Sequence, residues 1–195
     1  MRQLFVGLLL SAVVTIPAFA ALKQGAKAPD FSAKASLAGK EFTFSLKDAL
    51  KKGPVVVYFY PSAFTGGCNI QAHTFAENKE KFDAAGASII GVSRDGIARL
   101  NAFSADPQYC AGKIAVASDA DGAIAKSYDL TKMSLPAGLK DTRGEVIDHE
   151  FTERTTFIVT PDSKVAAVLS TADDKISPAA HVEKSLEVVR QLPKR

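Results

Sequence analysis

The sequence has few residues from which a disulfide framework or a metal site could be built. Its 195 residues include only two cysteines, Cys68 and Cys110, and three histidines. Residues 68–71 read Cys-Asn-Ile-Gln, so the paired thiols of a thiol–disulfide oxidoreductase are missing. The histidines show no ligand spacing to one another or to the cysteines, which gives no support for a metal site.

The sequence also lacks any concentration of charge of one sign. It has 24 Lys and Arg against 21 Asp and Glu, with a formal net charge of +3, and both signs are scattered. No stretch combines basic and aromatic residues into a patch, so nucleic-acid binding has no positive support. Repeats, low-complexity tracts and interdomain linkers are absent from the sequence, and its length suits one well-packed domain.

The first twenty residues have the pattern of a cleavable secretory signal peptide. Arg2 supplies a positive charge, residues 4–14 are almost continuously apolar, and residues 18–20 fit the small-x-small cleavage pattern. The alternative is a membrane anchor, but a bilayer span needs roughly 20 apolar residues. We predict cleavage after Ala20, which lowers the net charge to +2. The mature domain, residues 21–195, is then expected to be periplasmic or secreted, without membrane attachment.

Strand and helix patterns alternate along the mature chain. Residues 54–60 form a β-branched and aromatic run that is typical of a strand buried on both faces. Further strands are predicted at 40–45, 87–93, 114–118, 155–160 and 164–170, and helices at 66–86, 96–104, 123–128 and 178–192. This order predicts an α/β sandwich with a central mixed β-sheet flanked by helices.

Two segments give no regular pattern. Residues 21–37 read as an N-terminal segment in which Pro29 prevents an early helix. Residues 131–153 include Pro136, Gly138 and Gly144 and show no sustained period. A loop of this length in a compact domain is more often functional than idle, although the sequence assigns no role to its residues.

The segment around Cys68 has the features of a reactive-thiol site. A buried strand leads into a tight loop, and a helix is predicted to begin at or just before Cys68. The free amides and the dipole at a helix N-terminus stabilise a thiolate. Gly66 and Gly67 allow a small substrate to approach the backbone closely. Thr65 can direct its hydroxyl at the thiolate or at a bound oxygen, and Pro61 can shield the sulfur from water.

Pro61, Thr65 and Cys68 resemble the Pro-x-x-x-Thr-x-x-Cys motif of the peroxiredoxin family. The surrounding residues 59–72 look most like its bacterioferritin-comigratory, or Q-type, branch, and the likeness extends through residues 91–93, 118–122 and 154–159. The resemblance implies a thioredoxin-like sandwich and a thiol-dependent peroxidase that reduces hydrogen peroxide and organic hydroperoxides through a Cys68 sulfenic acid.

The same resemblance implies a set of roles and partners. Arg154 is expected to contact the Cys68 sulfur and the peroxide. No metal or organic cofactor is implied. The reductant is expected to be a thioredoxin-like or glutaredoxin-like thiol protein, and the protein a monomer or weak dimer.

The second cysteine departs from the pattern of many Q-type members. They place a cysteine five positions after the first, where this chain has His73, a residue expected on a partly exposed helix face. Cys110 is then the candidate resolving thiol, and the alternatives are a buried bystander or a permanent disulfide with Cys68. For the whole protein, the alternatives are a thioredoxin-like oxidoreductase, or a peroxide-sensing or metal-binding protein without turnover.

Overall fold

The computed structural model describes residues 21–193, and the predicted signal peptide lies outside this range. The strands are β1 (Ser32–Leu37), β2 (Lys40–Ser45), β3 (Val55–Phe59), β4 (Ser88–Ser93), β5 (Ala115–Ser118), β6 (Lys132–Met133), β7 (Phe151–Thr152), β8 (Thr155–Val159) and β9 (Val165–Ser170). The helices are α1 (Leu46–Leu50), α2 (Gly66–Ala84), α3 (Ile97–Ala105), α4 (Ala123–Ser127), α5 (Thr171–Asp174) and α6 (Pro178–Gln191).

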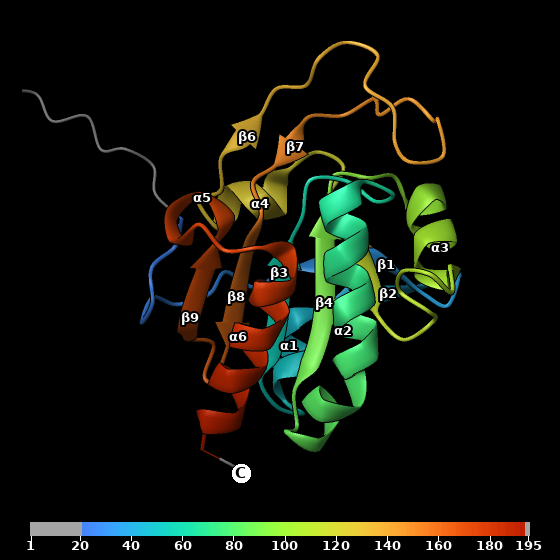
Figure 1. Ribbon diagram of the computed structural model, residues 1–195. Helices are drawn as coiled ribbons and strands as arrows, with labels where there is room; N and C mark the ends of the chain where they lie inside the picture. The colour runs from blue at the N-terminus through green and yellow to red at the C-terminus, as the bar shows by residue number, and fades with distance from the viewer. Residues whose placement is uncertain (1–20, 194–195) are drawn as a thin grey trace, which may run out of the picture.

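A seven-stranded mixed sheet forms the centre of the molecule (Figure 1). Its strand order is β2-β1-β5-β4-β3-β8-β9. Strands β3, β4 and β5 are parallel, whereas β1, β2, β8 and β9 join by antiparallel pairing. The predicted α/β sandwich with a mixed central sheet is therefore confirmed.

Strand β3 is buried on both faces because its side chains alternate between two hydrophobic clusters. Val56 and Tyr58 face the cluster shared with helices α2, α3 and α6. Val55, Val57 and Phe59 face the opposite cluster, which includes residues of α1 and α4. All five strand residues are at most 1% exposed. A continuous apolar run was the sequence pattern expected for this environment.

Helix boundaries follow local capping interactions. The chain leaves α2 through Gly86, which adopts the left-handed φ of +76° that glycine tolerates best. Ser177 caps α6 by accepting the Ala180 N–H at 3.2 Å, and Pro178 opens the helix. The carboxylate of Asp119 accepts N–H groups from the first turn of α4. These starts and stops were readable from the sequence.

Several short elements were not predicted. Strand β1 lies in the segment that was expected to be irregular, yet it pairs with both β2 and β5. Its sequence, Ser-Ala-Lys-Ala-Ser-Leu, is poor in β-branched and aromatic residues, so its neighbours in the sheet decide its conformation. Strands β6 and β7, which pair inside residues 131–153, were also not predicted, and neither were the short helices α1 and α5.

The sheet topology brings three chain segments to one edge. Phe59, at the end of β3, lies opposite Val92 of β4 and Thr155 of β8. The residues that follow β3 and β4 and the residues that precede β8 therefore meet at this edge. Helix α2 begins there, and the segment that contains β6 and β7 arches over it (Figure 1).

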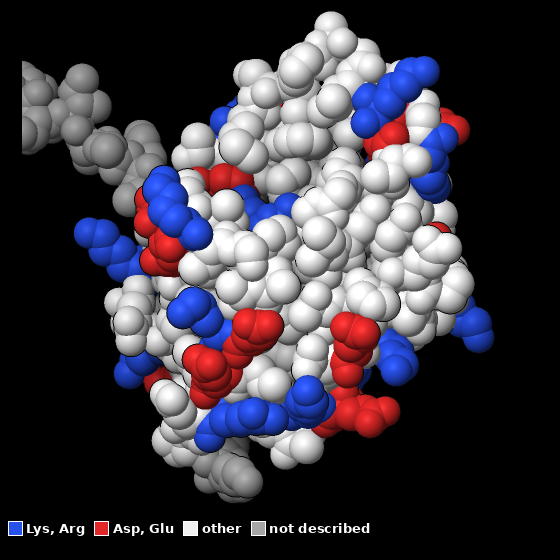
Figure 2. Space-filling model, viewed as in Figure 1, with Lys and Arg blue, Asp and Glu red and all other residues white. Residues whose placement is uncertain are grey.

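The described surface carries charges of both signs. On the face shown in Figure 2, Lys and Arg are interspersed with Asp and Glu over α2 and α6, and neither sign forms a continuous field. Among residues 21–193, no helix has both the length and the apolar character that a membrane crossing requires.

Gly91 of β4 leaves space that the Tyr58 ring fills. A Cβ at this position would lie 2.5 Å from Tyr58 Cζ and 2.6 Å from its hydroxyl oxygen. We expect Gly91→Ala to lower the free energy of unfolding by about 1–3 kcal/mol, because the buried ring has to shift. Urea unfolding measures this. Gly66→Ala is the control, since a Cβ there meets nothing within 4 Å, and equal losses in the two variants would contradict the packing argument.

Candidate active site

Cys68 lies in the first turn of α2, directly after the active-site loop, which we define as residues 60–65. Helix α2 starts at Gly66, so Cys68 is its third residue, and its sulfur-bearing side chain is 2% exposed. The first helical bond runs from the Asn69 N–H to the Thr65 carbonyl at 2.8 Å. The Thr65 side chain makes no cap hydrogen bond. The first-turn amides, including that of Cys68, are therefore available to an anion.

Arg154 lies against the sulfur although it is 86 residues away in sequence. Its Nη2 donates to Cys68 Sγ at 3.2 Å. The β3–β8 register accounts for this, because Thr155 lies opposite Phe59 and Arg154 therefore lies beside the active-site loop. No carboxylate among the described residues forms an ion pair with Arg154. Its positive charge is thus directed at the sulfur and at any anion beside it.

Gln71 supports Arg154 from one turn further along α2. Its Oε1 accepts a hydrogen bond from Arg154 Nη1, and its side chain is fully buried. A Cβ on Gly67 would lie 3.1 Å from Arg154 Nη2 and 3.3 Å from Pro178 Cγ. Glycine at this position therefore leaves the room that the guanidinium occupies between α2 and α6. The sequence did not single out Gln71 as a partner of Arg154.

His181 of α6 belongs to the same neighbourhood. Its Nδ1 lies 3.0 Å from Thr156 Oγ1, and its Nε2 lies 2.9 Å from Thr171 Oγ1. Burial and the positive charge of Arg154 lower the pKa of His181 to about 4, so its imidazole is neutral at neutral pH. Thr171 also donates its N–H to the Arg154 carbonyl at 3.1 Å. These contacts fix the backbone that presents the guanidinium.

The other two motif residues lie in the active-site loop. The Thr65 hydroxyl donates to the Ser62 carbonyl at 2.8 Å. Its proton is therefore not directed at the sulfur, whereas its lone pairs remain able to accept from a peroxide hydroxyl. Pro61 is partly exposed at the start of the loop.

Asp95 binds Ser62 and Ala63 of the active-site loop, and no role was predicted for it from the sequence. It follows β4 and is fully buried. Its carboxylate accepts the Ser62 hydroxyl, the Ala63 N–H and the Ser93 hydroxyl, each at 2.7 Å. Hydrogen bonds that outweigh burial hold the pKa of Asp95 below its ordinary value. The only feature noted near Asp95 in the sequence was the run of residues 91–93, Gly-Val-Ser, at the end of β4.

Cys110 lies in the turns that follow α3. It is fully buried and belongs to the same hydrophobic cluster as Cys68. Both cysteines are free thiols in the structure. Burial, together with the nearby charge of Asp106, raises the pKa of Cys110, so its thiol is protonated in the folded protein. The rings of Phe64, Phe103 and Tyr109 pack together in this region with centroids 5.0–5.7 Å apart.

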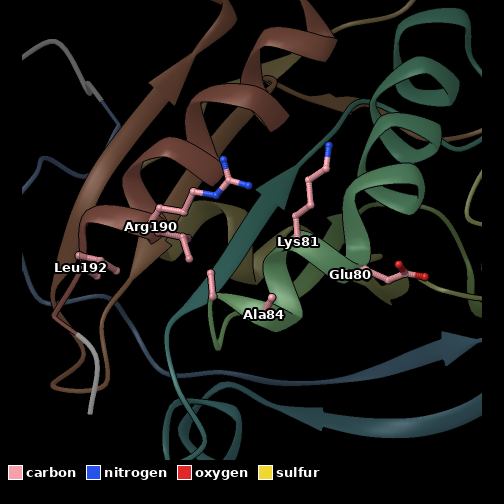
Figure 3. A pocket seen from close by; sticks show the side chains of 7 residues that line it. Glu80, Lys81, Ala84, Arg190 and Leu192 are labelled. Carbon is pink, nitrogen blue, oxygen red and sulfur yellow. The ribbon is translucent and has the colours of Figure 1, made fainter.

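Other candidate sites lie away from this edge. A hollow of about 390 Å³ lies between the C-terminal ends of α2 and α6. Figure 3 shows the side chains that line it, including those of Lys81, Arg190 and Leu192. The hollow lies at the far end of α2 from Cys68. His73 is half-exposed and pairs with Glu77 at 3.3 Å. Residues 21–193 contain no cluster of three or more His, Cys, Asp or Glu side chains placed to hold a metal ion.

Comparisons with known proteins identify the family and the fold of the chain. Residues 24–168 match the AhpC/TSA family. Peroxiredoxin Bcp of Xanthomonas campestris is 31% identical over 136 residues, which are 70% of this chain and 76% of that protein. The crystal structure of peroxidoxin BcpB from Mycobacterium tuberculosis has a TM-score of 0.72 and 28% identity, covering 89% of this chain and 99% of that one.

A third comparison concerns a relative with a described activity. The bacterioferritin comigratory protein of Xanthomonas campestris, studied for its alkyl peroxide reduction activity, has a TM-score of 0.61 and 28% identity. The alignment covers 80% of this chain and 89% of that one. The chain thus belongs to the AhpC/TSA family, in its bacterioferritin-comigratory or Q-type branch, and it is a thiol-dependent peroxidase.

Proposed function

We propose that Cys68 is the nucleophile of this peroxidase and that Arg154 is its principal electrostatic partner. The observation that carries this assignment is the contact of 3.2 Å between Arg154 Nη2 and Cys68 Sγ at the N-terminus of α2. A guanidinium and free helix amides lie beside this one sulfur, where they can interact with negative charge on it. They also provide donors for the negative charge that develops on the peroxide oxygens.

The proposed first step is displacement at oxygen. The Cys68 thiolate attacks the terminal oxygen of ROOH, an S–O bond forms and the O–O bond breaks. The departing RO⁻ takes up a proton and leaves as an alcohol, or as water when the substrate is hydrogen peroxide. Cys68 becomes a sulfenic acid, and the peroxide is reduced by two electrons. The lone pairs of Thr65 accept from the peroxide, Arg154 and the Cys68 amide orient it, and Pro61 limits access of water.

Peroxide consumption with a generic dithiol reductant tests this assignment. We expect turnover in the parent and none in Cys68→Ser. Arg154→Lys should reduce the second-order rate constant by about 10²–10³-fold, because an ammonium cannot contact both Cys68 and Gln71 as the planar fork does. Arg190→Lys, at the far end of α6, is the matched control and should retain the parental rate. A binding or sensing protein would show no turnover in the parent.

The proposed second step uses Cys110. Its sulfur attacks the Cys68 sulfenic acid, an S–S bond forms, and water leaves. A dithiol protein of the thioredoxin-like or glutaredoxin-like type then reduces the disulfide. Supporting this role, both cysteines are free and belong to one cluster. Disulfide geometry requires Cα atoms within about 7 Å, a separation that the two cysteines have to reach in the proposed step.

Replacing Cys110 tests the second step. After one equivalent of peroxide, the parent should lose both free thiols as an intramolecular disulfide. Cys110→Ser should instead accumulate a Cys68 sulfenic acid that dimedone traps, and its turnover with a dithiol-protein reductant should fall. Intact mass and thiol counting measure both outcomes. Unchanged turnover in Cys110→Ser would exclude the resolving role.

For location, we propose export to the periplasm or the extracellular space. Support comes from the sequence of residues 1–20, with its positive start, apolar run and small-residue cleavage pattern. Expression of the full chain in a bacterium with a secretion pathway should yield a mature protein that begins at Ala21. N-terminal sequencing measures this, and Ala20→Arg should block processing because the cleavage site requires a small residue. An unprocessed chain in the parent would contradict the proposal.

A further inference from the structure

The long loop, residues 131–153, contacts Phe64 of the active-site loop through Thr142 and Arg143, and it contacts Asp95 through His149. Thr142 donates both its N–H and its hydroxyl to the Phe64 carbonyl, at 2.9 and 2.8 Å. His149 places its Nε2 2.9 Å from Asp95 Oδ1, and Asp95 in turn holds Ser62 and Ala63. The long loop therefore braces the three residues that precede Thr65.

The braced segment is strained and needs external support. Phe64 has a φ of +60°, a left-handed conformation that is costly for a bulky residue. Such conformations persist only where surrounding contacts fix them. Phe64 directly precedes Thr65, the N-cap of α2. Any relaxation of Phe64 would move the start of the helix that carries Cys68.

The charge of Asp95 explains why His149 is bound there. A fully buried carboxylate is stable only with compensating positive charge and hydrogen bonds. Arg99 supplies one cation, with its Nε 2.9 Å from Asp95 Oδ1, but it also pairs with Asp141 at 2.7 Å. The second cation available to Asp95 is His149.

The hydrogen bonds of His149 favour protonation on both ring nitrogens. Its Nε2 faces the Asp95 carboxylate, and its Nδ1 lies 3.0 Å from the Glu150 carbonyl oxygen. Both of these groups are acceptors, and a neutral imidazole has only one N–H to donate. The Ser62 hydroxyl also lies 3.4 Å from Nε2, but it donates to Asp95 Oδ1 at 2.7 Å. Burial by itself lowers the pKa of His149, but these two hydrogen bonds and the charges of Asp95 and Asp148 raise it above 6.5.

Apart from Asp148, the remaining charges near His149 are already paired. The Glu150 carboxylate contacts Lys132 at 2.9 Å and Arg94 at 3.7 Å. Asp141, beyond Arg99, also contacts Arg143 at 3.1 Å. Asp95 is thus the carboxylate whose charge is directly matched by the imidazolium.

We propose that His149 is a positioning residue for peroxide reduction, whose imidazolium clamps the long loop onto Asp95 and so holds the active-site loop in place. This inference rests on the proposed role of Cys68 as nucleophile. Because the pKa of His149 is raised in the folded protein, the clamp is complete below pH 6.5 and is lost as the pH rises through the raised value. Release of the clamp frees Phe64 to relax and misplaces Cys68 relative to Arg154.

The pH dependence of Cys68 oxidation tests the clamp. In single-turnover reactions with hydrogen peroxide, the pH profile of the parent should show an acidic limb and an alkaline limb, and the rate constant should fall along the alkaline limb as the pH rises. We expect a fall of roughly tenfold, within the 100-fold that misplacement of a reacting group can cost. His149→Gln keeps an N–H donor toward Asp95 but cannot titrate, so its alkaline limb should be absent.

His73→Gln is the matched control, because it makes the same substitution at a half-exposed histidine on α2. It should keep both limbs of the parent profile. An alkaline limb that is missing in the parent, that persists in His149→Gln, or that disappears in His73→Gln would overturn the proposal.

Two measurements on the parent protein require neither peroxide turnover nor the His149→Gln variant. Nitrogen NMR of the parent should show one of its three histidines with a titration midpoint that is raised above the ordinary value and that matches the alkaline limb. Amide hydrogen exchange, corrected for its intrinsic pH dependence, should show residues 61–68 losing protection across the same range. A His149 midpoint that is not raised would refute the clamp. If the parent shows the expected His149 midpoint and the expected change in protection but does not react with peroxide, the nucleophile assignment alone is refuted.

Discussion

The contact between the Cys68 sulfur and the Arg154 guanidinium is the interaction on which the site depends. It joins the first turn of α2 to the start of β8, two segments that only the sheet brings together. A change of one residue in the β3–β8 register would turn the β8 side chains to the opposite face and shift Arg154 along the edge. The burial of β3 between two hydrophobic clusters prevents such a slip, because each cluster accepts only one set of its alternating side chains.

Two histidines, His181 and His149, show how the surroundings of an imidazole affect its protonation. His181 lies between two threonine hydroxyls and near the charge of Arg154, and its pKa falls to about 4. His149 lies between a carboxylate and a carbonyl oxygen, and its pKa rises. Hydroxyl groups can donate to a neutral ring, whereas two acceptors require two protons. The neutral histidine supports the arginine without competing for its anion, and the charged one compensates the buried Asp95.

The two cysteines have different environments within one hydrophobic cluster. Cys68 has a guanidinium and helix amides beside its sulfur, whereas Cys110 is surrounded by apolar and aromatic groups that raise its pKa. Of the two cysteines, Cys68 is therefore the one whose sulfur contacts a positively charged group.

The sequence by itself determined the long elements, the fold class and the family. The β-branched run of β3, the caps of α2, α4 and α6, and the Pro61, Thr65 and Cys68 motif are local patterns, and local patterns can be read from neighbouring residues. It also indicated Arg154, through its place before the Thr-Thr-Phe strand, but by resemblance and not by geometry.

Only the tertiary structure decided the elements and contacts that local pattern does not encode. Strand β1 has weak intrinsic preference and forms because β2 and β5 pair with it. Asp95 and His149 are 54 residues apart and have no motif to mark them, yet the sheet edge and the long loop bring them within 2.9 Å. Gln71 likewise gains a role only when Arg154 arrives from β8. A buried charged group needs a partner, and the fold, not the neighbouring sequence, determines which residue becomes that partner.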